Sequence, residues 1–258
     1  MITKLKKEIN DLDYGPVIVA SGEYKGRIGI YDDDEDEGLA IVYFGDFLLT
    51  NEYCTIPFEC LDDKITTQDL LERIKTLHSE ICENQNDIEM KNECLNELYL
   101  CSNLLSDRYI NAIENINEKK EHKIFISHSS KDLLLARAIA TDLINDGFSV
   151  FLDDWSINLG ENIVSHISEA IENSNSLVLI VSNDYLSSVY CTDEWTSFYI
   201  RYSKTNKNSI YPILIGDVEL PVLLSAIKYA RIKETSNYKE AYHQLIKAIK
   251  KRIQATES

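Results

Sequence analysis

From residue 123 onward, short apolar runs alternate with longer segments of helical periodicity. Four runs have the length and β-branched content of buried strands, at residues 123–127, 148–154, 176–182 and 209–216. Apolar positions at helical spacing fill the segments 131–147, 161–174, 191–204 and 237–253. Strands that alternate with helices form a parallel sheet covered on both faces, and binding sites in such sheets lie at the carboxyl ends of the strands. The pattern predicts an α/β domain.

Residues 14–61 have a different pattern, in which β-rich runs of four to six residues are separated by glycines and turn residues. Their spacing predicts a small five-stranded β-barrel over residues 1–64. Residues 65–120 are interpreted as a helical hairpin or linker, used for self-association or packed on a neighbouring domain. The first apolar stripe consists of Leu70, Leu71, Ile74, Leu77 and Ile81, and the second of Leu95, Leu98, Leu105, Tyr109, Ile113 and Ile116.

The charge of the chain is unevenly distributed. The net charge is −17, of which −15 falls on residues 1–121 and −2 on residues 122–258. This break supports two modules and argues against nucleic-acid binding, which needs a basic surface. The sequence has neither a secretion signal nor an apolar run long enough to span a membrane, and its six cysteines lack metal-ligand spacing. We expect a cytoplasmic protein without a metal site or membrane contact.

Four stretches, taken in order, resemble the sequence boxes of a TIR (Toll/interleukin-1 receptor) domain. They are "IFISHSSKD" (124–132), "VFLDDWSINLGENI" (150–163), "VLIVSNDYLSSVYCTDEW" (178–195) and "IYPILIG" (210–216). The resemblance implies a flavodoxin-like sheet of five parallel strands within a TIR domain at residues 121–258. In the N-terminal part, "ASGEYKGRIGIYD" (20–32) is similar to the glycine-marked core of KOW and other SH3-like barrels.

Some TIR domains are scaffolds, whereas others cleave NAD+ into nicotinamide and ADP-ribose or a cyclic isomer. The cleaving members carry a glutamate after an aromatic–Cys element, and Glu194 stands at that position, with Tyr190 in place of the usual tryptophan. The resemblance therefore implies an NAD+ nucleosidase or ADP-ribosyl cyclase in which Glu194 is catalytic. A glutamate near the start of a helix is also favoured by the helix dipole alone, so a structural role stays open.

The remaining residues expected to contact NAD+ end the first two strands of the domain or precede Glu194. They are Phe125, Ile126, Ser127, His128, Ser129, Lys131, Asp154, Trp155, Tyr190 and Cys191. Neither a G-x-G-x-x-G fingerprint nor a Walker motif is present, so NAD+ is expected as a substrate and no cofactor is implied. The Ser129 and Ser130 side chains are also expected to cap the helix that follows.

The family resemblance also implies a biological setting. Bacterial TIR proteins suggest a role in anti-phage immunity, with activation by self-association through TIR–TIR contacts. Residues 1–120 are then expected to control assembly in response to an unknown trigger or partner. The alternatives are a non-catalytic scaffold and a virulence factor that mimics host TIR adaptors. A scaffold has no need of Glu194, which favours the enzyme.

Overall fold

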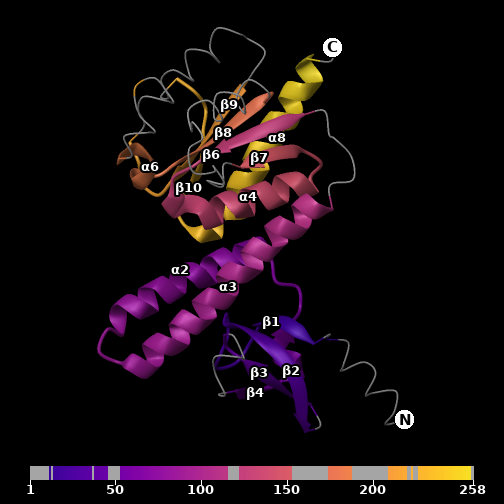
Figure 1. Ribbon diagram of the computed structural model, residues 1–258, viewed down its shortest axis with the longest axis vertical. Coiled ribbons are helices and arrows are strands. Elements are labelled where there is room, and N and C mark those ends of the chain that lie inside the picture. The colour runs from indigo at the N-terminus through magenta and orange to yellow at the C-terminus, as the bar shows by residue number, and fades with distance from the viewer. Residues whose placement is uncertain are drawn as a thin grey trace, which may run out of the picture. The chain divides into compact units, whose positions relative to one another are not determined.

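The protein separates into two compact units, Met1–Leu105 and Ser106–Ser258. The computed structural model describes residues 12, 14–36, 38–45, 53–115, 122–152, 174–187, 209–219, 222 and 226–256. Each unit contains a five-stranded sheet of its own (Figure 1). The finer division expected from the sequence, with limits after residues 64 and 120, stays a prediction.

The sheet of the N-terminal unit is antiparallel, with the strand order β4-β3-β2-β1-β5. Its elements are β1 (Gly15–Val19), β2 (Ile28–Asp36), β3 (Leu39–Tyr43), β4 (Cys54–Pro57), the 3₁₀ turn η1 (Phe58–Cys60) and β5 (Leu61–Asp62). The first strand thus pairs with both β2 and the last strand. Five short strands were expected here, and closure into an SH3-like barrel stays a prediction.

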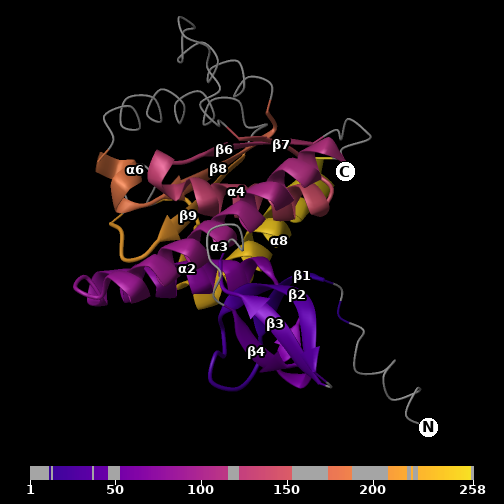
Figure 2. The same ribbon diagram turned by 60° about the horizontal axis from the view of Figure 1, so that its bottom comes forward.

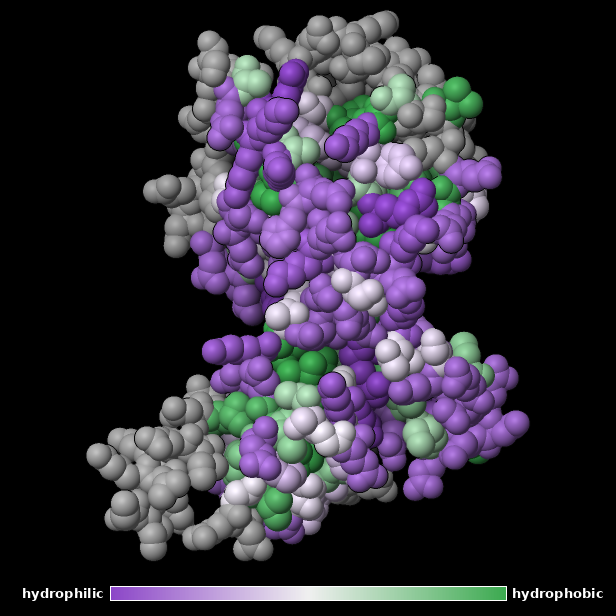
Figure 3. Space-filling model, turned by 180° about the vertical axis from the view of Figure 1, so that it is seen from behind, coloured by the Kyte–Doolittle hydropathy of each residue, from purple (hydrophilic) through white to green (hydrophobic). Residues whose placement is uncertain are grey.

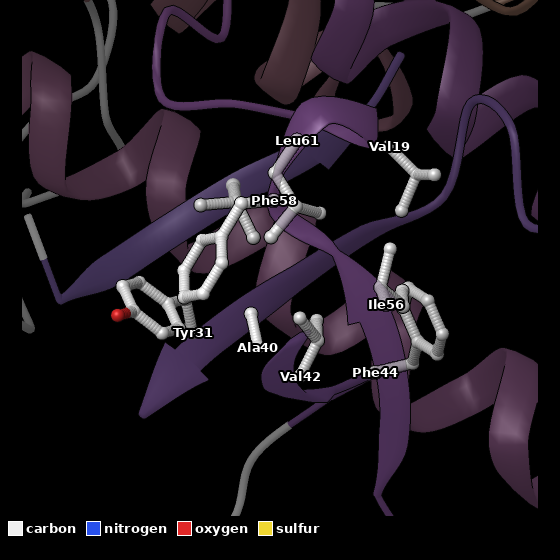
Figure 4. Packing of buried hydrophobic residues seen from close by; sticks show 9 residues of the cluster. Val19, Tyr31, Ala40, Val42, Phe44, Ile56, Phe58 and Leu61 are labelled. Atoms are coloured by element: carbon white, nitrogen blue, oxygen red, sulfur yellow. The ribbon is translucent and has the colours of Figure 1, made fainter. Parts of the chain in front are cut away.

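Alternating side chains of these strands form one hydrophobic cluster. In β3 the buried residues are Ala40 and Val42, two positions apart, as the period of a strand requires. Figure 4 shows their side chains pointing towards those of Ile56 and Phe58. The Phe58 ring meets the Tyr31 ring edge-on, with 5.6 Å between ring centroids. Burial of each such side chain stabilises the fold by about 1.5–3 kcal/mol.

Two helices complete this unit, α2 (Thr67–Glu83) and α3 (Ile88–Glu114), of which α3 continues into the C-terminal unit. The sequence pattern located both segments, and Leu105 and Tyr109 of the predicted α3 stripe are buried as expected. Leu95 of that stripe is 43% exposed, whereas Cys94, Glu97 and Cys101, which the stripe did not include, are buried. The first half of the inner face therefore carries two thiols and a carboxylate in the place of leucines.

The C-terminal unit contains a parallel sheet with the order β10-β9-β8-β6-β7. Its strands are β6 (Lys123–Ser127), β7 (Ser149–Leu152), β8 (Ser176–Val181), β9 (Ser209–Ile215) and β10 (Ala230–Ile232). The predicted flavodoxin-like sheet of five parallel strands is confirmed. Its last strand is three residues long, and the apolar pattern did not reveal it.

Helices α4 (Leu133–Asn145) and α8 (Tyr238–Thr256) lie side by side against one face of this sheet (Figure 2). The Tyr238 hydroxyl donates to Asp142 Oδ2 over 2.7 Å, and the Tyr242 hydroxyl donates to Asp146 Oδ2 over 2.6 Å. A 3₁₀ turn, η2 (Ser130–Asp132), precedes α4, so the helix begins two residues later than predicted. A second 3₁₀ turn, η3 (Thr235–Asn237), precedes α8.

The helices expected over residues 161–174 and 191–204 lie outside the described residues, apart from Ser174. On the face shown in Figure 3 the described surface is mainly hydrophilic, with apolar side chains in small groups. Among the helices in the described part of the chain, none combines the length and apolar character that crossing a bilayer requires.

Candidate active site at the carboxyl ends of the strands

The candidate site lies where the strand order of the parallel sheet reverses. From β6 the chain passes to β7, on one side of β6, and then to β8, which pairs with β6 on its other side. The connections that follow β6 and β8 therefore lead in opposite directions along the sheet. In open α/β sheets a crevice forms at such a switch point, outside the carboxyl ends of the strands. The described residues at this end of β6 and β8 come from the loop after β6 and the short helix α6 (Asn183–Ser187) after β8.

The loop after β6 is folded by its own serine. The Ser129 side chain accepts a hydrogen bond from the backbone N–H of Lys131 over 3.3 Å, and its carbonyl accepts one from the N–H of Asp132 over 2.8 Å. The expected capping role of Ser129 is therefore confirmed, for η2 rather than directly for α4. The turn brings Lys131 and Asp132 alongside α6.

Three side-chain pairs join this loop to the chain after β8. The hydroxyls of Ser127 and Tyr185 share a hydrogen bond of 3.1 Å. The Ser182 hydroxyl donates to Asp132 Oδ2 over 2.6 Å. The Lys131 ammonium donates to Asp184 Oδ1, also over 2.6 Å. The two loops that border the crevice are thus held together by side chains.

The Lys131–Asp184 ion pair and the Asp132–Ser182 hydrogen bond lie in different environments. Lys131 is 72% exposed and Asp184 44% exposed, so their ion pair is on the surface, and its hydrogen bond raises the pKa of Lys131. Asp132 is half-buried, and burial raises the pKa of its carboxyl above the ordinary value, although the Ser182 hydroxyl opposes this shift. The Lys131 ammonium has three N–H donors, so a phosphate can bind beside Asp184, but the carboxylate competes with it for the charge of Lys131.

The structure places six of the predicted site residues. Ser127, His128, Ser129 and Lys131 lie at the carboxyl end of β6, as expected. Phe125 and Ile126 are buried inside β6, where the Phe125 ring packs at 5.7 Å from the Phe151 ring. Contact of any of these six residues with NAD+ stays a prediction.

The other predicted site residues, Asp154, Trp155, Tyr190, Cys191 and Glu194, lie outside the described residues. Helix α6 ends at Ser187, seven positions before Glu194 in the sequence. The described parts of the chain hold no group of three or more histidine, cysteine or acidic side chains suited to a metal ion.

Sequence reasoning missed three residues of this site, Ser182, Asp184 and Tyr185. The signal was available, because "SNDY" follows the buried strand "LVLIV" directly, at the sheet edge where sites lie. Polar residues after a buried strand of a parallel sheet belong in the list of candidates. The serine and tyrosine here are themselves buried, which shows that they serve the fold of the site.

Comparison with known proteins agrees with this arrangement. Residues 124–246, just under half of the chain, match the family model described as TIR domain. The TIR domain of the Toll-related receptor TRR-2 from Hydra magnipapillata, a solved structure, matches with a TM-score of 0.40 and 20% identity. That match covers 49% of this chain and 97% of the receptor domain.

Two curated relatives are named as synthases. The probable 2' cyclic ADP-D-ribose synthase TcpO of Methanobrevibacter olleyae is 31% identical over 153 residues, which is 57% of this chain and 44% of that protein. The 2' cyclic ADP-D-ribose synthase BtTIR of Bacteroides thetaiotaomicron is 27% identical over 119 residues, or 45% of this chain and 40% of that protein. The chain thus spans less than half the length of either relative.

Proposed function

We propose that this protein is an NAD+ nucleosidase and ADP-ribosyl cyclase that breaks the bond between nicotinamide and ribose. The observation that carries the proposal is the TIR-domain match over residues 124–246, shared with relatives named as cyclic ADP-ribose synthases. The matched segment contains Tyr190, Cys191 and Glu194 in the order that NAD+-cleaving TIR domains use. The product is ADP-ribose or a cyclic isomer, and the names of the relatives favour a 2' cyclic product.

The chemistry suits a site with one catalytic carboxylate. When the bond between the ribose anomeric carbon and the nicotinamide nitrogen breaks, the electron pair stays with nicotinamide, which leaves as a neutral ring. The leaving group therefore needs no proton, whereas ordinary glycoside hydrolysis uses a second carboxyl as an acid. The Glu194 carboxylate stabilises the positive charge that develops on the sugar. Water that captures this cation loses a proton and gives ADP-ribose, and a nucleophile of the same molecule gives a cyclic isomer.

The binding of NAD+ is assigned to the crevice between β6 and β8. Ser127, Ser129 and Lys131 border it and supply hydroxyl and ammonium donors to phosphate and ribose oxygens. NAD+ enters as a substrate, and no further cofactor takes part. This role for the loop after β6 agrees with the rule that ligands bind at a topological switch point.

The proposal extends to activation. TIR–TIR contacts between copies of this chain complete the site, and the N-terminal unit, with its SH3-like barrel and helical hairpin, controls that association in the cytoplasm. The strongly acidic N-terminal residues would keep free copies apart by mutual repulsion until a trigger binds. Anti-phage immunity is the setting that this arrangement suits.

The test is NAD+ consumption by the purified full-length protein over a wide concentration range, with products resolved by chromatography. Glu194→Gln should abolish consumption, because the amide cannot stabilise the sugar cation. Glu234→Gln, at an exposed position of the same domain, is the matched control and should leave the rate unchanged. Equal activity of wild type and Glu194→Gln would refute the role of Glu194. Absence of consumption at every concentration would favour a scaffold.

A further inference from the structure

Four residues connect the two loops at the switch point through three hydrogen bonds, two of which are made by opposite ends of Tyr185. We call Ser127, Asp132, Ser182 and Tyr185 the switch-point clamp. Ser182 is its centre, because its hydroxyl donates to Asp132 Oδ2 over 2.6 Å and accepts from the backbone N–H of Tyr185 over 3.0 Å. The hydroxyl of Tyr185 shares a hydrogen bond of 3.1 Å with the hydroxyl of Ser127.

Helix α6 depends on this clamp for its position. The helix has only five residues, and helices of that length do not form in isolation. Ser182 stands at its N-cap, since the Ser182 carbonyl accepts from the N–H of Leu186 over 3.1 Å while its hydroxyl accepts from Tyr185. Asp132 thereby fixes the hydroxyl that caps the helix.

The clamp is protected from water at its α6 end. Tyr185 is 2% exposed and Ser182 is 6% exposed, so a hydroxyl that loses its partner cannot turn to solvent. Asp132 is a costly acceptor, because its half-buried charge opposes folding at neutral pH. A neutral acceptor would hold Ser182 at lower cost to stability.

We propose that Asp132, Ser182 and Tyr185 are positioning residues for the cleavage of NAD+, which hold α6 at a fixed place beside the crevice. This inference rests on the proposed function. The chain leaves α6 at Ser187, seven residues before Glu194, so the placement of α6 sets the point from which the catalytic segment starts. The loop after β6 is also folded by Ser129, which holds the N–H groups of Lys131 and Asp132, so phosphate binding there depends less on that placement.

The proposal predicts a specific split in the kinetics of the full-length protein. Ser182→Ala, Asp132→Ala and Tyr185→Phe should each lower kcat by about 10- to 100-fold, because small misplacements of catalytic groups have effects of that size. KM should change by less than about threefold, since ground-state binding is retained. Asp132→Asn keeps an oxygen that accepts from Ser182 and should retain kcat within about threefold.

Comparison of Asp132→Ala with Asp132→Asn distinguishes a positioning role of Asp132 from direct participation in the reaction. A group that transfers a proton or supplies charge to the reaction would lose as much activity in Asp132→Asn as in Asp132→Ala. Tyr238→Phe is the matched control for Tyr185→Phe, because Tyr238 is equally buried and donates to Asp142 at the far end of α4. It should lower stability and leave kcat unchanged.

Hydrogen–deuterium exchange at the amides of Tyr185 and Leu186 provides a readout independent of activity. Ser182→Ala should speed exchange at both amides, with no change at the amides of β9. Inactive wild type would refute the proposed function. Active wild type with unchanged kcat in Ser182→Ala and Asp132→Ala, or unchanged exchange in α6, would overturn the clamp.

Discussion

Arg73 and Glu97 form a bidentate ion pair inside the N-terminal unit. Arg73 Nε donates to Glu97 Oε1 over 2.7 Å, and Arg73 Nη2 donates to Oε2 over 2.8 Å. The Glu97 carboxylate is 0% exposed and accepts two more hydrogen bonds, from Arg27 Nε over 2.9 Å and from the N–H of Ile28 over 2.8 Å. One carboxylate therefore joins α3 to α2 and to the start of β2.

Replacement of this carboxylate should be strongly destabilising. Glu97→Gln removes the charge that compensates two arginines and sets an amide donor against a guanidinium. We expect the free energy of unfolding to fall by about 3–5 kcal/mol, the usual effect of breaking a buried ion pair. Urea unfolding monitored by circular dichroism measures this change in the free energy of unfolding.

The control is Glu93→Gln, because Glu93 is 41% exposed and lies 3.7 Å from Arg27. Its effect should stay below about 1 kcal/mol, as for other surface pairs. Equal destabilisation by the two substitutions would mean that burial adds nothing to the contribution of the Glu97 ion pair.

The stability of the C-terminal unit should depend on pH through Asp146. Burial raises the pKa of this carboxyl, but hydrogen bonds from Tyr242 and Lys250 outweigh it, so the pKa lies below its ordinary value of about 4. The stabilisation is fully present above pH of about 4 and is lost as the pH falls through the lowered pKa.

Asp146→Asn should therefore be less stable than wild type at neutral pH, by about 1 kcal/mol. The difference should shrink below pH of about 4, where wild type takes up the proton. Thermal unfolding from pH 7 to pH 2 measures the difference. Asp107→Asn, at an exposed position, serves as the control. A difference that is constant with pH would exclude the ionic contribution.

Gly45 should not tolerate a side chain. Its φ is +123°, and a Cβ atom there would lie 2.7 Å from Asn96 Cβ and 3.1 Å from the Asn96 carbonyl carbon on α3. Gly45→Ala therefore combines backbone strain with a clash against helix backbone, and we expect a loss of about 2 kcal/mol or more. Gly26→Ala is the control, since its φ of +86° is also positive but its Cβ would meet nothing within 4 Å. If the two substitutions lowered the free energy of unfolding equally, the loss would come from the positive φ alone and not from the contact with Asn96.

Lys131 and Asp184 should have opposite effects on substrate affinity if the proposed function holds. Lys131→Met should raise the KM for NAD+ by about three- to tenfold, and Asp184→Asn should lower it by releasing the ammonium from its ion pair. Steady-state kinetics at low salt measures both. Lys123→Met, at the amino end of β6, should leave KM unchanged. A change of KM in the same direction for both substitutions would contradict competition for the Lys131 ammonium.

The sequence pattern predicted regular elements better than the contacts between distant residues. Period and apolar content located β6, β8 and β9, because short continuous apolar runs are typical of strands buried on both faces of a sheet. They could not locate β10, which has only three residues. The burial of Cys94, Glu97 and Cys101 on α3 was missed for a different reason. A buried glutamate is predictable only together with its partners, and Arg27 lies 70 residues away from Glu97.

The same limit applies to the candidate site, where contacts between residues distant in the sequence could not be predicted. Ser127 and Lys131 were predicted from their place after a strand, whereas Ser182 and Tyr185 were overlooked although they also follow one. Their part in the site arises from hydrogen bonds to residues more than 49 positions earlier, which no local pattern reports. The roles of Asp154, Trp155, Tyr190, Cys191 and Glu194 stay predictions, because these residues lie outside the described part of the chain.

The passage of α3 from one compact unit into the other has a practical consequence for expressing the protein in pieces. The charge break suggests cutting at residue 121, but the C-terminal unit begins at Ser106, whose hydroxyl accepts a 3.0 Å hydrogen bond from Arg137 on α4. A fragment that starts at residue 121 leaves Arg137 without that partner. Low yield or inactivity of such a fragment would then report damage to the C-terminal unit and would be mistaken for the loss of the proposed control by the N-terminal unit. Gene fragments intended to carry the C-terminal unit alone should begin upstream of Ser106.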